Sequence, residues 1–230
     1  YGFVPQRITS DSRYIYITFA SSGEVFYGGM GAYACDTGSL SGGKVYRYRI
    51  ENGVPVFNKD ITPEDHIPCG YSGICSNGKM LLLSTVCRKN GGDIIYTSTD
   101  SGESWKIIMN RLEYCRFDWN IPYMKPRYNG GGNCVHWISD IKLSPFDSDT
   151  ALFNTGTGLF MITGLASGDV LVKPFCEGIE ETVHLNVYTT PHGRNRIIDI
   201  IGDLGGFAFE DYDSECENSF ANENGDRYIT

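Results

Sequence analysis

Short apolar runs, each interrupted by a polar turn, recur along the whole chain. In four places an apolar strand, a polar turn and a second apolar strand follow one another. No segment keeps the apolar period of about 3.6 residues that marks an amphipathic helix, so the pattern predicts strands. The four predicted hairpins are Arg7–Thr9 with Tyr14–Phe19, Gly73–Cys75 with Met80–Thr85, Ile138–Leu143 with Ala151–Asn154, and Val183–Tyr188 with Arg196–Ile201.

A second candidate hairpin follows each of these pairs. The second hairpins are Lys44–Ile50 with Val54–Ile61, Asp93–Thr97 with Trp105–Met109, Leu159–Thr163 with Val170–Val172, and Phe207–Phe209 with a partner near Arg227–Thr230. Asn52-Gly53 and Asn77-Gly78 lie at turns, and both residue types tolerate a positive φ. Four strands per unit, repeated at roughly 45 to 70 residues, are typical of propeller blades. A sandwich of meanders has similar strand spacing. We favour an all-β fold of four-stranded antiparallel propeller blades.

Composition and charge narrow the function classes. Of the 230 residues, 41% are hydrophobic, which predicts a real core and excludes a disordered chain. The net charge of −9 argues against nucleic acid or an anionic membrane surface as a partner, because both require clustered Lys and Arg. No apolar run approaches the roughly 18 residues that a membrane span needs. These features fit a soluble protein that acts on a neutral ligand.

Cysteine usage bears on the compartment. The chain has eight cysteines and no Cys-x-x-Cys pair, so a zinc ribbon is not expected. An even number of cysteines in a β-rich chain favours disulfides and an oxidising, extracellular location; buried free thiols are the alternative. The chain begins at Tyr1 without a basic or apolar leader, so we expect a signal peptide to be removed already or to lie upstream.

The segment Ser98–Trp105 matches the Asp-box pattern Ser-x-Asp-x-Gly-x-Ser/Thr-Trp. We expect Asp100 to accept hydrogen bonds from backbone amides of the turn, Gly102 to supply an unusual φ, and Trp105 to pack back between strands. Asp boxes occur in several propeller proteins, so the motif predicts architecture. We therefore interpret Asp100 as structural and not catalytic.

The stretch Cys134–Tyr212 carries the most informative motifs. It contains Trp137-Ile138-Ser139-Asp140, then Asn154-Thr155-Gly156-Thr157-Gly158, then Gly178-Ile179-Glu180-Glu181-Thr182, then Asp203-Leu204-Gly205-Gly206. In this order and spacing, the stretch resembles the xyloglucanases of glycoside hydrolase family 74. The resemblance implies a partial seven-bladed propeller. Residues 1–178 would form about three blades of a first propeller, and residues 179–230 the first blade of a second.

The same resemblance implies a mechanism. Proteins of this family stack two seven-bladed propellers and hydrolyse the β-1,4-glucan backbone of xyloglucan with inversion, using one Asp from each propeller. Asp203 matches the Asp of the second propeller, the candidate general acid. The other carboxylate has no match in this chain. Inversion requires both, because one protonates the leaving oxygen while the other activates water.

Aromatic residues supply the candidate glycan contacts. Tyr114–Gly132 is aromatic and rich in Pro and Gly, and we expect it to be a loop. Aromatic faces suit the C–H groups of sugars, and Tyr and Arg tips suit hydroxyls. The candidates are Trp137, which matches a tryptophan of the family, and Trp119, Tyr123, Tyr128 and Arg127 in the loop.

Two functions from different classes remain open. The first is an extracellular xyloglucan-type glycoside hydrolase whose partners are a polysaccharide and further propeller blades. The second is a non-catalytic propeller for glycan binding or extracellular assembly with other copies of the chain, which the unmatched carboxylate and the many cysteines favour. Neither needs a cofactor. A metal site is not expected, because the four histidines show no His-x-x-His spacing.

Overall fold

The computed structural model of the chain is all-β. In the described part it contains four sheets and no helix. The structure describes residues 2–21, 42–64, 69–86, 88, 92–110, 114–121, 135, 137–179, 182–202, 205–211, 213, 216 and 218–219. The chain divides into two compact units, the first Tyr1–Phe117 with Val135–Lys173 and the second Asp118–Cys134 with Pro174–Thr230. The assignment of residues 1–178 and 179–230 to two different propellers stays a prediction.

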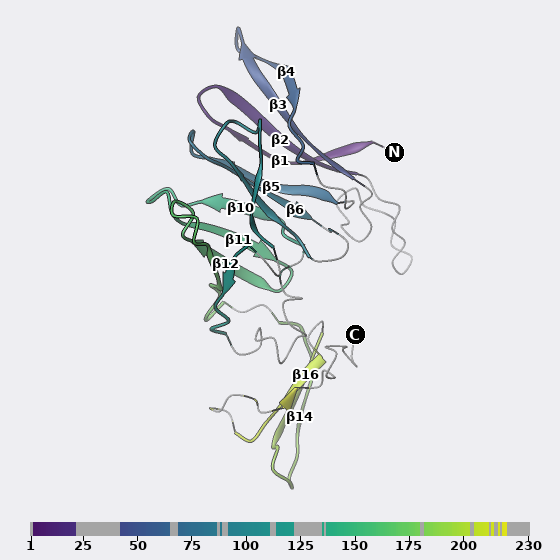
Figure 1. Cartoon of the computed structure of the whole chain (residues 1–230). Coiled ribbons are helices and arrows are strands. Elements are labelled where there is room, and N and C mark those ends of the chain that lie inside the picture. Colours follow the sequence, from purple (N-terminus) through teal and green to yellow (C-terminus); the bar gives the residue numbers. More distant parts are fainter. Residues whose placement is uncertain are drawn as a thin grey trace. The chain divides into compact units, whose positions relative to one another are not determined.

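The first two sheets each contain four strands in sequence order, joined as antiparallel hairpins (Figure 1). Because neighbours in sequence are also neighbours in the sheet, each sheet is a meander of the kind that forms a propeller blade. The predicted hairpins are confirmed here. The strands are β1 (Phe3–Ser10), β2 (Tyr14–Ser21), β3 (Gly43–Glu51) and β4 (Val54–Asp60), then β5 (Gly70–Ser76), β6 (Leu81–Val86), β7 (Ile95–Ser98) and β8 (Lys106–Met109).

The third sheet follows the same plan and then adds a strand at its edge. Its meander consists of β10 (Asp140–Leu143), β11 (Ala151–Thr155), β12 (Gly158–Thr163) and β13 (Leu171–Pro174). The extra strand is β9 (Arg116–Phe117), which pairs parallel to β13. We expected a loop from Tyr114 to Gly132, and this part of it is instead a strand. Arg116 also forms an ion pair with Asp169 at 3.1 Å, which fastens the segment to the sheet.

The fourth sheet forms the described core of the second unit. It contains β14 (His184–Thr189), β15 (Ile197–Ile201), β16 (Gly205–Phe209) and β17 (Asn218–Ser219), again in sequence order. The partner of β16 was expected near Arg227–Thr230, and that expectation is wrong. The observed partner is β17, whose polar sequence gives no apolar alternation by which a strand could be recognised.

Two Asn-Gly turns close hairpins by different means. Asn52 and Gly53 both have positive φ, 54° and 79°, as a tight two-residue hairpin turn requires. At the other turn only Gly78 is positive, at 82°. There the Asn77 side chain accepts hydrogen bonds from the amides of Lys79 and Met80, at 3.0 and 2.8 Å. The same dipeptide therefore marks both turns through different chemistry.

Glycines allow the first three sheets to pack closely. A Cβ on Gly43 would lie 2.7 Å from the carbonyl oxygen of Phe19 and 2.9 Å from the amide nitrogen of Tyr71, so β3 passes close to β5. A Cβ on Gly73 would lie 2.5 Å from the amide nitrogen of Ile141, which brings β5 against β10. Each sheet of the first unit thus packs face to face on the next one along the chain, as blades do.

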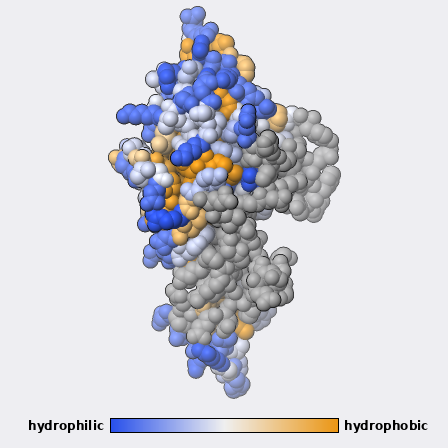
Figure 2. Space-filling model, in the orientation of Figure 1, coloured by the Kyte–Doolittle hydropathy of each residue, from blue (hydrophilic) through white to orange (hydrophobic). Residues whose placement is uncertain are grey.

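Some sheet faces remain exposed. On the first sheet, rings of β2, β3 and β4 form a continuous series: Phe19 on Tyr46 at 5.0 Å, Tyr46 on Phe57 at 5.5 Å, and Phe57 on Tyr48 at 5.8 Å. Phe57 is 56% exposed. Apolar residues also interrupt the hydrophilic surface in Figure 2. In the second unit, β14 is exposed along its whole length. Exposed apolar faces of this kind are typical of surfaces that bind a partner.

Two of the eight cysteines are not in disulfides, contrary to the expectation that an even number of cysteines would be paired. Cys75 is buried and Cys115 is half-buried, and both are thiols. Burial raises the pKa of each to about 11, so both stay protonated and unreactive at neutral pH. The described residues include no helix long and apolar enough to span a bilayer.

Candidate functional site

Trp137 is the predicted glycan contact that the structure defines best. It lies just before β10 and its side chain is 48% exposed. Its φ is +57°, a left-handed backbone conformation that is unusual for a bulky residue and costs about 1 to 2 kcal/mol. A Cβ on Gly156 would lie 3.4 Å from the six-membered ring of the indole. The structure therefore brings together two of the motifs on which the family resemblance rests.

Both backbone polar groups of Ile138, the residue after Trp137, are held by hydrogen bonds. The Ile138 amide donates a hydrogen bond to Asp93 Oδ2 at 3.1 Å. The Ile138 carbonyl accepts one from Ser72 Oγ at 2.5 Å. Both partners belong to the second sheet and its connections, whereas Trp137 leads into the third. This clamp by Asp93 and Ser72 fixes the backbone beside the strained φ of Trp137.

Asp93 is a buried carboxylate that sequence reasoning missed. It is 1% exposed, and its Oδ1 accepts hydrogen bonds from Thr85 Oγ1 at 2.9 Å and the Arg88 amide at 3.1 Å. Burial raises the pKa of Asp93 above its ordinary value, and these hydrogen bonds oppose the rise. An acidic residue just before the apolar run Ile94-Ile95-Tyr96 was the available signal, because a carboxylate at the start of a buried strand needs partners.

The predicted catalytic residue Asp203 lies outside the described residues. The strands that flank it are described: β15 ends at Ile201, β16 begins at Gly205, and these two residues pair. Gly205 and Gly206 have φ of 88° and 149°, values that favour glycine. The two glycines of the Asp203 motif therefore occupy positions that need their conformational freedom.

Next to this hairpin, three side chains form a hydrogen-bonded chain. Asp199 is 9% exposed and lies 2.9 Å from His184 Nδ1. The other ring nitrogen of His184 lies 2.8 Å from Thr182 Oγ1. In addition, the amide of Gly202 donates a hydrogen bond to the carbonyl of Val183 at 2.8 Å. The Thr182–His184–Asp199 hydrogen bonds therefore lie at β14 and β15, next to the Asp203 motif in sequence.

The other predicted contacts are only partly described. Trp119 is half-buried and lies in the second unit, whereas Trp137 lies in the first. Tyr123, Arg127 and Tyr128 lie outside the described residues, as do Glu180 and Glu181. The described residues hold no group of three or more His, Cys, Asp or Glu placed to bind a metal ion.

The Ser98–Trp105 turn ties the second sheet to the first. Asp100 accepts hydrogen bonds from the amide of Ser104 at 2.9 Å and from its hydroxyl at 2.5 Å, and Gly102 has φ of 84°. Trp105 Nε1 donates to the carbonyl of Ile61 at 2.7 Å, and Arg47 donates to the carbonyl of Ser101, also at 2.7 Å. The contacts of Asp100 are those of a turn-forming residue, in keeping with its structural interpretation.

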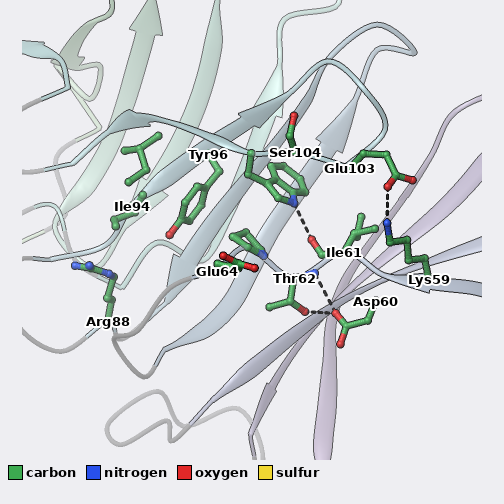
Figure 3. A pocket seen from close by; sticks show the side chains of 14 residues that line it. Lys59, Asp60, Ile61, Thr62, Glu64, Arg88, Ile94, Tyr96, Glu103 and Ser104 are labelled. Atoms are coloured by element: carbon green, nitrogen blue, oxygen red, sulfur yellow. Dashed lines mark hydrogen bonds and ion pairs between the residues drawn. The ribbon is translucent and has the colours of Figure 1, made fainter.

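An open pocket of about 680 Å³ lies beside this turn (Figure 3). Its wall includes Tyr96 and Trp105, and its rim carries the ion pair between Lys59 and Glu103 at 2.5 Å. The Trp105 indole N–H already donates its hydrogen bond to the Ile61 carbonyl. The pocket is therefore built from residues that hold the two sheets together, and it contains none of the predicted site residues.

Comparison with known proteins agrees with the fold and with the family resemblance. The chain is 26% identical over 196 residues to xyloglucanase Xgh74A of Acetivibrio thermocellus, covering 74% of this chain and 22% of that protein. It is 24% identical over 244 residues to the oligoxyloglucan-reducing end-specific xyloglucanase of Emericella nidulans, covering 90% of this chain and 30% of that protein. The resemblance to glycoside hydrolase family 74 is confirmed. No family model matches the chain.

Solved family-74 structures show the same fold. The xyloglucanase of Xanthomonas campestris superposes with a TM-score of 0.74 at 21% identity, over 96% of this chain and 30% of that one. The family-74 enzyme of Niastella koreensis gives 0.72 at 20% identity, with the same coverage. The chain thus spans about a fifth to a third of the length of these similar proteins.

Proposed function

We propose that the chain is part of an extracellular glycoside hydrolase that cleaves a β-1,4-glucan of the xyloglucan type with inversion of configuration. The observation that carries this proposal is the similarity to xyloglucanases over 74% and 90% of the chain. The substrate class follows from those relatives. Further propeller blades would complete the enzyme and supply the second carboxylate.

Asp203 has the role of one acid/base residue in this proposal. An inverting hydrolase needs one protonated and one ionised carboxyl group, about 6.5 to 9.5 Å apart, on opposite faces of the scissile bond. The residues that flank Asp203 are apolar, and burial there would raise its pKa as a general acid requires. The positive φ of Gly205 and Gly206 supports a tight backbone beside it that a sugar can approach.

Trp137 has the role of a sugar platform. Its half-exposed indole presents a flat apolar face, and a sugar ring offers a flat array of C–H groups to such a face. Trp119, Tyr123, Tyr128 and Arg127 are further proposed glucan contacts. The Asp box at Ser98–Trp105 has an architectural role in this scheme.

A second candidate is a non-catalytic propeller for glycan binding or extracellular assembly. It is favoured by the exposed apolar faces, above all β14, where Leu185, Val187 and Tyr188 are 50%, 53% and 50% exposed. A strand of this kind can pair with another copy of the chain by strand addition. Such a protein would bind the polysaccharide without shortening it.

Product analysis separates the two candidates. The intact natural protein is incubated with xyloglucan and, separately, with an unbranched β-1,4-glucan, and the new chain ends are followed by proton NMR. We expect oligosaccharides from xyloglucan whose first-formed ends are the α-anomer, because inversion of a β-linkage gives α. Binding without any release of oligosaccharide would favour the second candidate, and β-anomers formed first would overturn the inverting mechanism.

A further inference from the structure

Among the described residues, Trp137 has the backbone conformation that most needs an explanation. A tryptophan at φ +57° persists only where its surroundings fix it. Trp137 is also half-exposed, so burial of its ring cannot be the whole cause. Something on the protein side must hold the backbone while the ring faces outward.

The contacts of Asp93 supply that cause. Its Oδ2 accepts the hydrogen bond of the Ile138 amide, the first peptide N–H after the strained residue. Its Oδ1 is fixed by Thr85 Oγ1 and by the Arg88 amide, at 2.9 and 3.1 Å. A carboxylate held at both oxygens has little rotational freedom, so it sets where the Ile138 amide must lie.

The backbone carbonyl of Ile138, in the next peptide unit, is also fixed. Ser72 Oγ donates to the Ile138 carbonyl, and Gly156 leaves room for the indole to lie against the β11–β12 turn. An alanine at position 156 would bring a methyl group to 3.4 Å from the ring. The backbone on either side of Ile138 is therefore fixed by the Asp93–Ser72 clamp, and the indole lies against the turn at Gly156.

We propose that Asp93 is a positioning residue for glycan binding, which holds Trp137 in its left-handed conformation and so presents the indole face to a sugar ring. This inference rests on the proposed function, because it takes the Trp137 ring to be a sugar platform. Asp93 is 1% exposed and does not itself touch the glycan. An amide in its place can still accept at one oxygen, but its NH₂ group cannot accept from a backbone amide.

A double-mutant cycle tests the proposal. Affinity of the intact natural protein for a xyloglucan oligosaccharide is measured by calorimetry for wild type, Asp93→Asn, Trp137→Ala and the double variant. We expect each single change to weaken binding about tenfold, and the double variant to bind no more weakly than Trp137→Ala, since coupled residues are not additive. Asp60→Asn, an exposed carboxylate-to-amide change on β4 of the first sheet, is the matched control and should leave affinity unchanged.

A spectroscopic reading separates positioning from a general loss of folding. The protein is labelled with fluorotryptophan, and the resonance of Trp137 is assigned by its loss in Trp137→Phe. We expect Asp93→Asn to shift or broaden this resonance and to leave those of Trp105 and Trp119 in place.

The outcomes distinguish the two proposals. If wild type binds and Trp137→Ala binds less well while Asp93→Asn binds normally, the positioning inference is wrong and the proposed function stands. Additive losses in the double variant would also overturn the inference. If wild type binds no glycan, the proposed function fails and the inference fails with it.

Discussion

Replacement of Gly73 by alanine tests the packing of neighbouring sheets that underlies the whole account. Its Cβ would lie 2.5 Å from the Ile141 amide nitrogen, 2.8 Å from Ser84 Oγ and 2.9 Å from the Asp140 carbonyl carbon. Ordinary contacts between such atoms are about 3.5 to 4.0 Å, so the overlap is roughly 1 Å. Two of the three neighbours, the Ile141 nitrogen and the Asp140 carbonyl carbon, are backbone atoms of β10, which cannot rotate away as a side chain can.

The magnitude follows from these contacts. Overpacking a well-packed interior costs about 1 to 3 kcal/mol, and the rigid neighbours place Gly73→Ala at the upper end. The Gly73 amide also donates to Ser84 Oγ at 2.9 Å. Its loss would add about 1 kcal/mol. We therefore expect the free energy of unfolding to fall by about 3 to 4 kcal/mol.

Gly42→Ala is the matched control. Among the described residues, a Cβ on Gly42 would meet Phe3 alone, at an ordinary 3.8 Å, and we expect a change within about 0.5 kcal/mol. Urea unfolding is followed by circular dichroism for both variants, with equal slopes required so that midpoints can be compared. A Gly73→Ala protein as stable as Gly42→Ala would refute the close approach of β5 and β10.

Three further predictions concern single side chains. Hydrogen bonds from the Ser104 hydroxyl and amide hold the pKa of Asp100 at about 2. The stabilising contribution of Asp100 is therefore present above its unfolded pKa of about 3.9 and is lost as the pH falls toward 2. The free energy of unfolding, measured at a series of acid pH values, should show this loss in wild type and not in Asp100→Asn. Burial raises the pKa of Cys75 and Cys115 to about 11, so neither thiol should react with iodoacetamide at pH 7 until urea unfolds the protein. Alkylation is read by mass spectrometry, and rapid alkylation of either cysteine in the native protein would contradict this prediction. Trp105→Phe removes the hydrogen bond to the Ile61 carbonyl and should cost about 1 to 3 kcal/mol in urea unfolding, because that acceptor loses its partner; an unchanged midpoint would contradict the role of this contact.

Local sequence signals located most of the strands. The hairpins from β1 to β8 were predictable because each combines an apolar run with a turn residue such as Asn52-Gly53. β9 was missed because two residues are too short to show a period, and its partner β13 lies far along the chain. The partner of β16 was misplaced for a related reason, since Asn218–Ser219 is polar and carries no strand signal.

The candidate site was only partly predictable for a different physical reason. Trp137 was found by its motif, but its φ and its clamp depend on hydrogen bonds between sheets that no local pattern encodes. Asp93 was missed because its hydrogen-bond partners, Thr85 and Ile138, lie before and far after it in the sequence, so no local pattern marks it. The thiols of Cys75 and Cys115 show the same limit, since pairing depends on distances between cysteines and not on their number.

The rate of xyloglucan hydrolysis with and without Asp203 tests the central claim most directly. The intact natural protein, its Asp203→Asn variant and the control variant Asp100→Asn are compared by initial release of reducing ends. If Asp203 is an acid/base residue, Asn at this position should lower the rate by about 10²- to 10⁴-fold, while the control keeps the wild-type rate. Equal rates for wild type and Asp203→Asn would contradict the catalytic assignment.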